Sequence, residues 1–125
     1  MIYGIGTDIV AIQRMAENLD QYGERFARRI LTDNELAQFH ETTKPAHFLA
    51  KRFAAKEALV KALGTGFRDG LNLRDISISN DHLGKPILQF SPRAQAWLDT
   101  RKITHSHLSL SDEQDFAIAF VTLES

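Results

Sequence analysis

Two carboxylates and a lysine stand out in the sequence because of the residues around them. Asp8 follows two closely spaced glycines, Gly4 and Gly6. Glu57 lies in a helix-forming run of mostly apolar residues, and Lys61 follows it one helical turn later. Magnesium is commonly held by one or two carboxylates together with water and substrate phosphates. If the fold brings Asp8 and Glu57 together, the sequence predicts a sparse magnesium site with a lysine available for phosphate oxygens.

Glu57 is unusual for the position it takes on its predicted helix. On an ideal helix whose apolar face is centred on Phe53, Glu57 lies roughly 40° from that centre, in the same stripe as Leu49 and Val60. A carboxylate on an apolar face must be paired, protonated or bound to a cation, because burying it bare is costly. An ion pair with Lys61 at i,i+4, worth about 0.2–0.5 kcal/mol, is the simpler alternative.

A glycine-rich end to the same helix adds to the predicted chemistry. Gly64, Thr65 and Gly66 offer an open backbone for phosphate oxygens. Together with two carboxylates and a lysine, this favours phosphoryl-type transfer, in which positioning and charge neutralisation do most of the work. The segment follows a helix and lacks the lysine of a Walker loop, so a P-loop is excluded. A glycosidase pair of carboxylates would leave the lysine and the glycines without a role.

Composition sets the class of protein in which these residues must work. With 125 residues, 43% of them hydrophobic and 25% charged, the chain predicts a single domain spanning residues 1–125. The net charge of −1 gives no basic field for nucleic acid. The absence of cysteine excludes disulfides and thiolate metal sites. Neither a membrane-spanning run nor a signal sequence is evident, so we expect a cytoplasmic protein.

The elements that must position the two carboxylates differ in type. Alternation over residues 2–10 predicts a strand that carries Gly4, Gly6 and Asp8 on one face. Glycines there allow another backbone or a ligand to come close to Asp8. The alternative is a bulge or tightly packed corner at which Asp8 caps the next helix. Glu57 belongs to a long helix predicted from Pro45 to Leu63, with Gly64 after its end and small alanine faces suited to close packing.

The rest of the chain predicts an α+β fold. Helical periodicity begins at residue 12, and a capping box at Thr32 and Glu35 predicts another helix. The later part predicts a hairpin over 73–79 and 87–90, a short helix after Ser91, and strands over 105–111 and 116–123. We therefore expect an antiparallel sheet packed against one long helix and several shorter ones.

A small basic cluster stands out against the nearly neutral chain. Arg25, Arg28 and Arg29 surround Phe26 and Ile30. Such a cluster is usually a solvated surface, but here it is also a candidate docking site for an acidic partner.

Two segments together resemble a known family. Residues 4–10, Gly-Ile-Gly-Thr-Asp-Ile-Val, and residues 52–66, Arg-Phe-Ala-Ala-Lys-Glu-Ala-Leu-Val-Lys-Ala-Leu-Gly-Thr-Gly, closely resemble the two signature motifs of the 4′-phosphopantetheinyl transferases. The short length points to the small holo-acyl-carrier-protein synthase group. The resemblance continues through residues 84–86, Gly-Lys-Pro, to residues 107–110, His-Leu-Ser-Leu, and so covers nearly the whole chain.

The resemblance implies a reaction and a role for each matching residue. The reaction is transfer of 4′-phosphopantetheine from coenzyme A to a serine of apo-acyl carrier protein, with release of adenosine 3′,5′-bisphosphate, in fatty acid biosynthesis. Asp8 and Glu57 match the magnesium ligands, and Lys61 matches a lysine near the pyrophosphate. Lys61, Glu57 or a metal-positioned water takes the serine proton. The residues implied for coenzyme binding are Lys61, Gly64, Thr65, Gly66, Gly84, Lys85, Pro86 and His107, with His105 as a weaker histidine candidate.

The resemblance also implies partners. Acyl carrier proteins are acidic, so we expect Arg14, Arg25 and Arg28 to dock the carrier, with Met15 or Phe26 supplying an apolar contact. Small members of the family are typically homotrimers with active sites between subunits. Two other interpretations remain: a non-catalytic module that recruits an acidic protein, and a magnesium-dependent phosphohydrolase.

Overall fold

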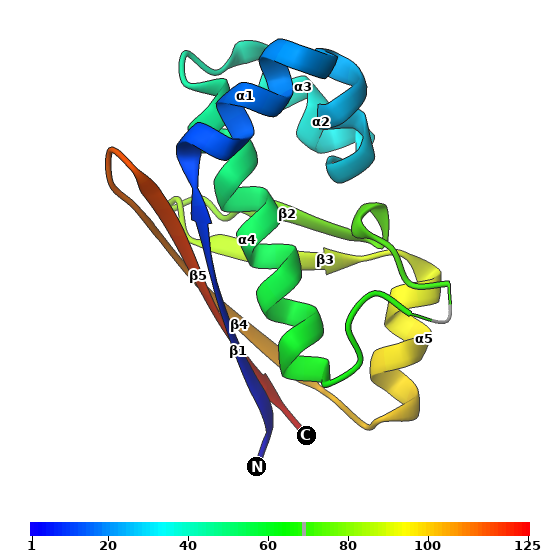
Figure 1. Cartoon of the computed structure of the whole chain (residues 1–125). Helices are drawn as coiled ribbons and strands as arrows, with labels where there is room; N and C mark the ends of the chain where they lie inside the picture. The colour runs from blue at the N-terminus through cyan, green and yellow to red at the C-terminus, as the bar shows by residue number, and fades with distance from the viewer. Residues whose placement is uncertain (69) are drawn as a thin grey trace.

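The fold is built around the long helix α4, Pro45–Leu63, which packs lengthwise along the strands of a twisted antiparallel sheet (Figure 1). A computed structural model describes residues 1–68 and 70–125. The other elements, in chain order, are β1 (Ile2–Ala11), α1 (Ile12–Tyr22), α2 (Glu24–Ile30), α3 (Asp33–Glu41), the 3-10 turn η1 (Leu73–Asp75), β2 (Ile76–Asn80), β3 (Pro86–Phe90), α5 (Pro92–Thr100), β4 (His105–Asp112) and β5 (Phe116–Glu124).

The strands form two antiparallel sheets. The larger has the order β1–β5–β4, so the last strand of the chain lies between the first strand and its own hairpin partner. The smaller is the β2–β3 hairpin. Both ends of the chain lie side by side (Figure 1), and the Met1 amino group donates to the Ser125 carbonyl at 3.1 Å. The predicted α+β fold, an antiparallel sheet packed against a long helix and shorter helices, is confirmed.

Glycines allow β1 and α4 to touch backbone to backbone. A Cβ added to Gly4 would lie 2.1 Å from the Ala62 carbonyl oxygen, and one added to Gly6 would lie 1.9 Å from that of Ala58. Real Cβ atoms essentially never come within 3.0 Å of such a neighbour. The expected close approach at the glycine face is therefore made by a backbone, and the small residues of α4 face it.

Asp8 has no part in starting the next helix. The N-cap of α1 is Ala11, and within the described part of the chain no side chain makes a capping hydrogen bond there. A register irregularity in β1 lies between Ile2 and Gly4, before the aspartate. The alternative role of Asp8 as a helix cap is therefore wrong.

The predicted helix ends are present. Thr32 and Glu35 form the expected capping box at the start of α3. Gly64 closes α4 in the left-handed conformation, with φ of 80°, which glycine adopts without strain. The Ser91 hydroxyl accepts the Ala94 amide at the start of α5.

The predicted hairpin begins later than expected. Leu73–Asp75 forms the 3-10 turn η1, because the Asn72 side chain accepts the Arg74 amide and the Asp75 carboxylate accepts the Asn72 amide. Alternation alone does not reveal this local capping, so the strand prediction over residues 73–75 is wrong.

The larger sheet is buried on one face only. Ala117, Ala119 and Val121 of β5 are buried in the core, whereas the alternating residues between them point away from it. That second face exposes large apolar side chains from β1 and β5. These residues, named here the apolar sheet face, are Tyr3, Ile5, Ile9, Phe116, Ile118 and Phe120.

In the part of the chain that the structure describes, no helix has the length and apolar character needed to cross a membrane.

Candidate active site

Asp8 and Lys61 meet where β1 packs on α4. Lys61 Nζ donates to Asp8 Oδ1 at 3.0 Å and to the Thr7 carbonyl oxygen at 3.0 Å. The Asp8 side chain is 16% exposed and that of Lys61 53% exposed. The aspartate is thus largely covered where the strand packs on the helix, while the lysine reaches it from the solvent side.

Glu57 faces the same region from α4. Partial burial raises the pKa of Glu57, and the nearby Asp8 charge raises it further. Lys61 and Arg14 act in the opposite direction. The two predicted metal ligands therefore interact electrostatically, and they repel each other when both are ionised.

The simpler alternative, an ion pair between Glu57 and Lys61, is not found among the described residues, in which Lys61 pairs with Asp8. The position of Glu57 also differs from the expectation. It is half-buried, and so is Phe53, while Leu49 and Val60 are buried. The predicted apolar stripe was thus centred too close to the glutamate, which lies at the edge of the buried face.

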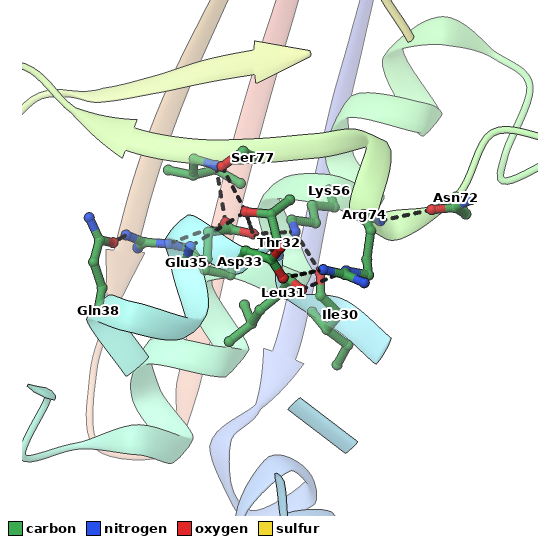
Figure 2. A network of polar contacts seen from close by, with 12 residues as sticks. Ile30, Leu31, Thr32, Asp33, Glu35, Gln38, Lys56, Asn72, Arg74 and Ser77 are labelled. Carbon is green, nitrogen blue, oxygen red and sulfur yellow. Dashed lines mark hydrogen bonds and ion pairs between the residues drawn. The ribbon is translucent and has the colours of Figure 1, made fainter. Parts of the chain in front are cut away.

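The fully buried charge on α4 is instead the neighbouring Lys56. Its side chain is 0% exposed and lies 2.6 Å from the Glu35 carboxylate, which is 1% exposed (Figure 2). Sequence reasoning interpreted Glu35 only as half of a capping box. A signal was present, because Lys56 lies at i,i+3 and i,i+7 from Leu59 and Leu63, which are both buried.

The glycine segments predicted for coenzyme binding lie at two separate turns. Gly64, Thr65 and Gly66 follow α4, and the Thr65 hydroxyl donates to the Gly66 carbonyl at 2.9 Å. Gly84 and Lys85 lie in the exposed turn before β3, and Pro86 is the first residue of that strand. The Asp81 carboxylate orders that turn by accepting the Leu83 and Lys85 amides.

The two histidines of β4 are both exposed. His107 is hydrogen-bonded to Glu124 on the adjacent strand β5, and this bond lowers the pKa of the Glu124 carboxyl. His105 Nδ1 lies 3.0 Å from the Thr104 hydroxyl. Across residues 1–68 and 70–125, no hydrogen bond or ion pair joins His107 to Asp8 or Glu57.

The basic cluster borders a cavity between α1 and α2. The cavity has a volume of about 390 Å³, and its lining residues are Asn18, Tyr22, Arg25, Phe26 and Arg29. The exposed Arg28 pairs with Glu24 at 2.7 Å. Met15 is only 1% exposed and belongs to the core, so it cannot supply the apolar contact expected of Met15 or Phe26. Of those two residues, only Phe26 reaches the surface.

Arg14 lies apart from this cavity and nearer to the carboxylates. Its guanidinium carbon is 5.8 Å from the centre of the Phe53 ring, and its charge lowers the pKa of Glu57. A carrier that contacts Arg14 would therefore lie beside the predicted metal ligands.

The described residues contain no cluster of three or more acidic or histidine side chains able to hold a metal ion by themselves. Asp8 and Glu57 thus make a two-carboxylate set, whose further ligands would have to be water or substrate oxygens. Close mutual repulsion between two carboxylates is relieved by a divalent cation, so the residues present fit magnesium.

Comparison with known proteins places these features in a family. The family model of the 4′-phosphopantetheinyl transferase superfamily matches residues 4–121. A holo-[acyl-carrier-protein] synthase of Nitrosospira multiformis is 53% identical over 124 residues, covering 99% of this chain and 99% of that protein. A holo-[acyl-carrier-protein] synthase of Vibrio cholerae is also 53% identical, covering 99% of this chain and 98% of that protein.

Solved structures agree with this. The crystal structure of holo-[acyl-carrier-protein] synthase from Neisseria meningitidis is 49% identical, with a TM-score of 0.96 and coverage of 100% of both chains. The Helicobacter pylori enzyme, solved in complex with coenzyme A, is 31% identical, with a TM-score of 0.84 and coverage of 96% of this chain and 99% of that one. The chain belongs to the 4′-phosphopantetheinyl transferase superfamily and, within it, to the holo-[acyl-carrier-protein] synthases.

Proposed function

We propose that this chain transfers 4′-phosphopantetheine from coenzyme A to a serine of apo-acyl carrier protein, with Asp8 and Glu57 holding a magnesium ion. In this reaction the serine oxygen bonds to the β-phosphorus, and the bond from that phosphorus to the bridging oxygen breaks. Adenosine 3′,5′-bisphosphate leaves with that oxygen, and the serine proton passes to a base. The observation that carries the proposal is the gathering of Asp8, Glu57 and Lys61 at the glycine contact of β1 and α4. There Lys61 Nζ lies 3.0 Å from Asp8 Oδ1, and the Asp8 charge raises the pKa of Glu57.

Magnesium bound by Asp8 and Glu57 would supply positive charge for the pyrophosphate oxygens. Glu57 favours this role because burial and Asp8 both raise its pKa, so its ionised form gains from a nearby cation. The Asp8 side chain is only 16% exposed, and such partial removal from water strengthens its interaction with a cation.

Lys61 is suited to the charge that develops on the leaving phosphate. Its ammonium is half-exposed and carried on a flexible stem, so it can contact Asp8 and also reach an anionic substrate. Gly64, Thr65 and Gly66 lie one turn further on, where their backbone can accommodate phosphate or the pantetheine arm. Three groups are candidates for the proton acceptor: Lys61, Glu57 and a water positioned by the metal.

The carrier protein is proposed to dock on α1 and α2. Arg14, Arg25 and Arg28 present positive charge on this side of the molecule, and Phe26 lines the cavity between the two helices. An acidic helix would complement this surface in charge, which raises association rates and sets orientation.

A homotrimer with active sites between subunits is proposed for the assembly. Monomers rarely expose contiguous apolar patches larger than about a few hundred Å² without a binding role. The apolar sheet face carries six large side chains from two adjacent strands. A neighbouring copy seated on this face would bury them. It would also bring four of the residues predicted to bind the coenzyme to the Asp8 and Glu57 of its partner. These residues are Gly84, Lys85, Pro86 and His107.

The resemblance to this family further supports a cytoplasmic role in fatty acid biosynthesis, since an acyl carrier protein is the implied substrate.

The decisive test combines the protein with coenzyme A, magnesium and an apo-acyl carrier protein and then weighs the carrier by mass spectrometry. A mass gain equal to phosphopantetheine that is lost in Glu57→Ala supports the proposal. Release of free phosphate with an unmodified carrier would favour a phosphohydrolase, and carrier binding without modification would favour a non-catalytic module. Either of these results contradicts the proposal.

A further inference from the structure

A buried ion pair lies on the side of α4 opposite to β1. Lys56 Nζ donates at 2.6 Å to Glu35 Oε1 and at 2.6 Å to the carbonyl oxygen of Ile30, the last residue of α2 (Figure 2). Its surroundings are dry, because neither side chain of the pair is more than 1% exposed. The lysine therefore makes fixed contacts with two neighbouring elements at once.

Glu35 is itself held in place by the backbone. Its Oε1 accepts the Thr32 amide at 3.0 Å, and its Oε2 accepts the Ile78 amide of β2 at 3.0 Å. Because these bonds use both carboxylate oxygens, the carboxylate cannot rotate to follow a displaced lysine. The pair thus fixes one point of α4 relative to α3 and β2.

Stability alone does not explain such a pair. Taking two charges out of water costs several kcal/mol per ion, and apolar replacements of similar volume are often as stable or more stable. The lysine bears this cost, since burial lowers its pKa and the contact with Glu35 only partly offsets the effect. What a buried ion pair provides that an apolar contact does not is a specific geometry.

The position of the pair on α4 determines which geometry it controls. Successive residues of an α-helix are about 100° apart around its axis. Lys56 therefore lies nearly opposite to Ala58, at roughly 160°, and Glu57 lies at roughly 100° from Ala58. Ala58 faces Gly6 of β1. The helix is thus held between a glycine contact on one side and the buried ion pair on nearly the opposite side, with Glu57 between them.

The glycine contact alone leaves the rotation of α4 poorly defined. Gly4 and Gly6 set how closely the strand and the helix approach, but they have no side chains that could interlock with the helix surface. A rotation of 10° moves a group at a radius of about 5–6 Å by about 1 Å. A displacement of that size at a catalytic group can cost about 10²-fold in rate.

We propose that Lys56 and Glu35 are positioning residues that fix the rotation of α4 and thereby direct the Glu57 carboxylate toward Asp8. The proposal rests on the metal-binding role proposed above for Asp8 and Glu57. Arg52, one turn before Lys56, contributes less. Its Nε is 3.7 Å from Glu35 Oε2 and has no hydrogen-bond partner among the residues that the structure describes. Its terminal nitrogen donates to Gln38 instead.

The test uses the double variant Glu35→Gln/Lys56→Met, because removing the lysine alone would leave an unpaired buried carboxylate. The introduced glutamine can still accept a backbone amide, and the introduced methionine fills the volume of the lysine stem. Glu35→Gln alone is the second variant. It leaves the buried Lys56 ammonium without its carboxylate, so we expect it to be less stable than the double variant. Lys51→Met is the matched control. This lysine of α4 is half-buried, and its ion-pair partner is Asp112 at 3.8 Å, so it takes no part in the contacts of Lys56 and Glu35.

Two measurements are made at temperatures where thermal unfolding shows every variant to be folded. Binding of Mn²⁺ in the presence of coenzyme A is followed by the loss of the free-ion electron paramagnetic resonance signal. Turnover is followed by the carrier mass. We expect the double variant to bind Mn²⁺ about 10–100-fold more weakly and to lose about 10–100-fold in kcat. We expect at least as large a loss in Glu35→Gln, because the unpaired Lys56 ammonium would disturb the same contact, and unchanged values in Lys51→Met.

Glu57→Gln in the same assays separates the two proposals. If Glu57→Gln loses Mn²⁺ binding while the folded pair variants keep wild-type affinity and kcat, the positioning role is overturned and the metal site stands. If Glu57→Gln itself binds Mn²⁺ as the wild type does, the metal site proposed for Glu57 is wrong and the positioning role is overturned with it. A loss of thermal stability in the pair variants without any change in Mn²⁺ affinity or kcat would show a purely structural role and would also overturn the proposal.

Discussion

Gly6→Ala should separate the two carboxylates without changing either of them. The new Cβ would lie 1.9 Å from the Ala58 carbonyl oxygen and 2.7 Å from the Ala62 amide nitrogen, both of which are backbone atoms of α4. Neither atom can move without the helix. Since real Cβ atoms stay at least 3.0 Å from such neighbours, β1 and α4 must separate by about 1 Å at this point.

The size of the effect follows from that displacement. Forcing an extra methyl group into a packed contact costs about 1–3 kcal/mol, which for a domain of this size lowers Tm by about 4–12 °C. Asp8 lies two residues beyond Gly6 on the same face of β1 and would move with the strand, away from Glu57. A misplacement of about 1 Å at a catalytic group predicts a loss of about 10²-fold in kcat.

The assay must distinguish a displaced site from a weakened fold. Leu98→Ala in α5 is the control, because this buried side chain lies away from the contact of β1 with α4 and its truncation costs about 2–5 kcal/mol. Both variants are compared at a temperature where circular dichroism shows them folded. We expect the carrier to gain phosphopantetheine at the wild-type rate with Leu98→Ala and about 10²-fold more slowly with Gly6→Ala.

A folded Gly6→Ala protein with wild-type kcat and wild-type Mn²⁺ affinity would refute this reasoning. It would mean that the close contact of β1 with α4 does not determine how Asp8 and Glu57 are placed.

Three further predictions concern charge and assembly. Because the folded-state pKa of Glu57 is raised above 4.5, its stabilising contribution is complete below that pH and is lost as the pH rises through the folded-state value. Without divalent cations, Glu57→Gln should therefore raise the Tm at neutral pH and abolish transfer; an unchanged or lower Tm contradicts this. Phe120→Asp, on the apolar sheet face, should reduce the sedimentation mass to that of a monomer and remove activity, whereas an unaltered mass would argue against that interface. Arg25→Glu should raise the KM for the carrier about tenfold, which corresponds to about 1.4 kcal/mol of binding free energy, and should leave the KM for coenzyme A unchanged. Equal changes in both KM values would exclude a docking role.

Local sequence signals were sufficient for the element that carries the site. Pro45 at the first turn and Gly64 just beyond the last residue define both ends of α4, because proline suits a helix start and glycine the left-handed residue after a helix end. The alternation in β1 likewise separated an exposed face from the face that carries Gly4, Gly6 and Asp8. In both cases the pattern acts within a few residues, so no knowledge of the tertiary structure was needed.

The partner of the buried Lys56 was out of reach of the same reasoning. That partner, Glu35, lies 21 residues earlier, in a capping box that is complete without the lysine. Nothing local shows that α3 packs against α4 so that the two side chains meet. The sequence pattern indicated Glu57 as the charge on the apolar face of α4. The fold leaves Glu57 half-exposed and buries the neighbouring Lys56.

The packing also changes what the first signature segment requires. Taken alone, two glycines before Asp8 suggest room for a ligand, yet at both positions the space of a side chain is occupied by backbone oxygens of α4. The aspartate in β1 and the glutamate in α4 can share a cation only if strand and helix come this close. The glycines are therefore part of the predicted metal site although they bind nothing. It follows that a chain with both acids but bulkier residues at positions 4 and 6 should fold with its carboxylates apart and should not bind the metal.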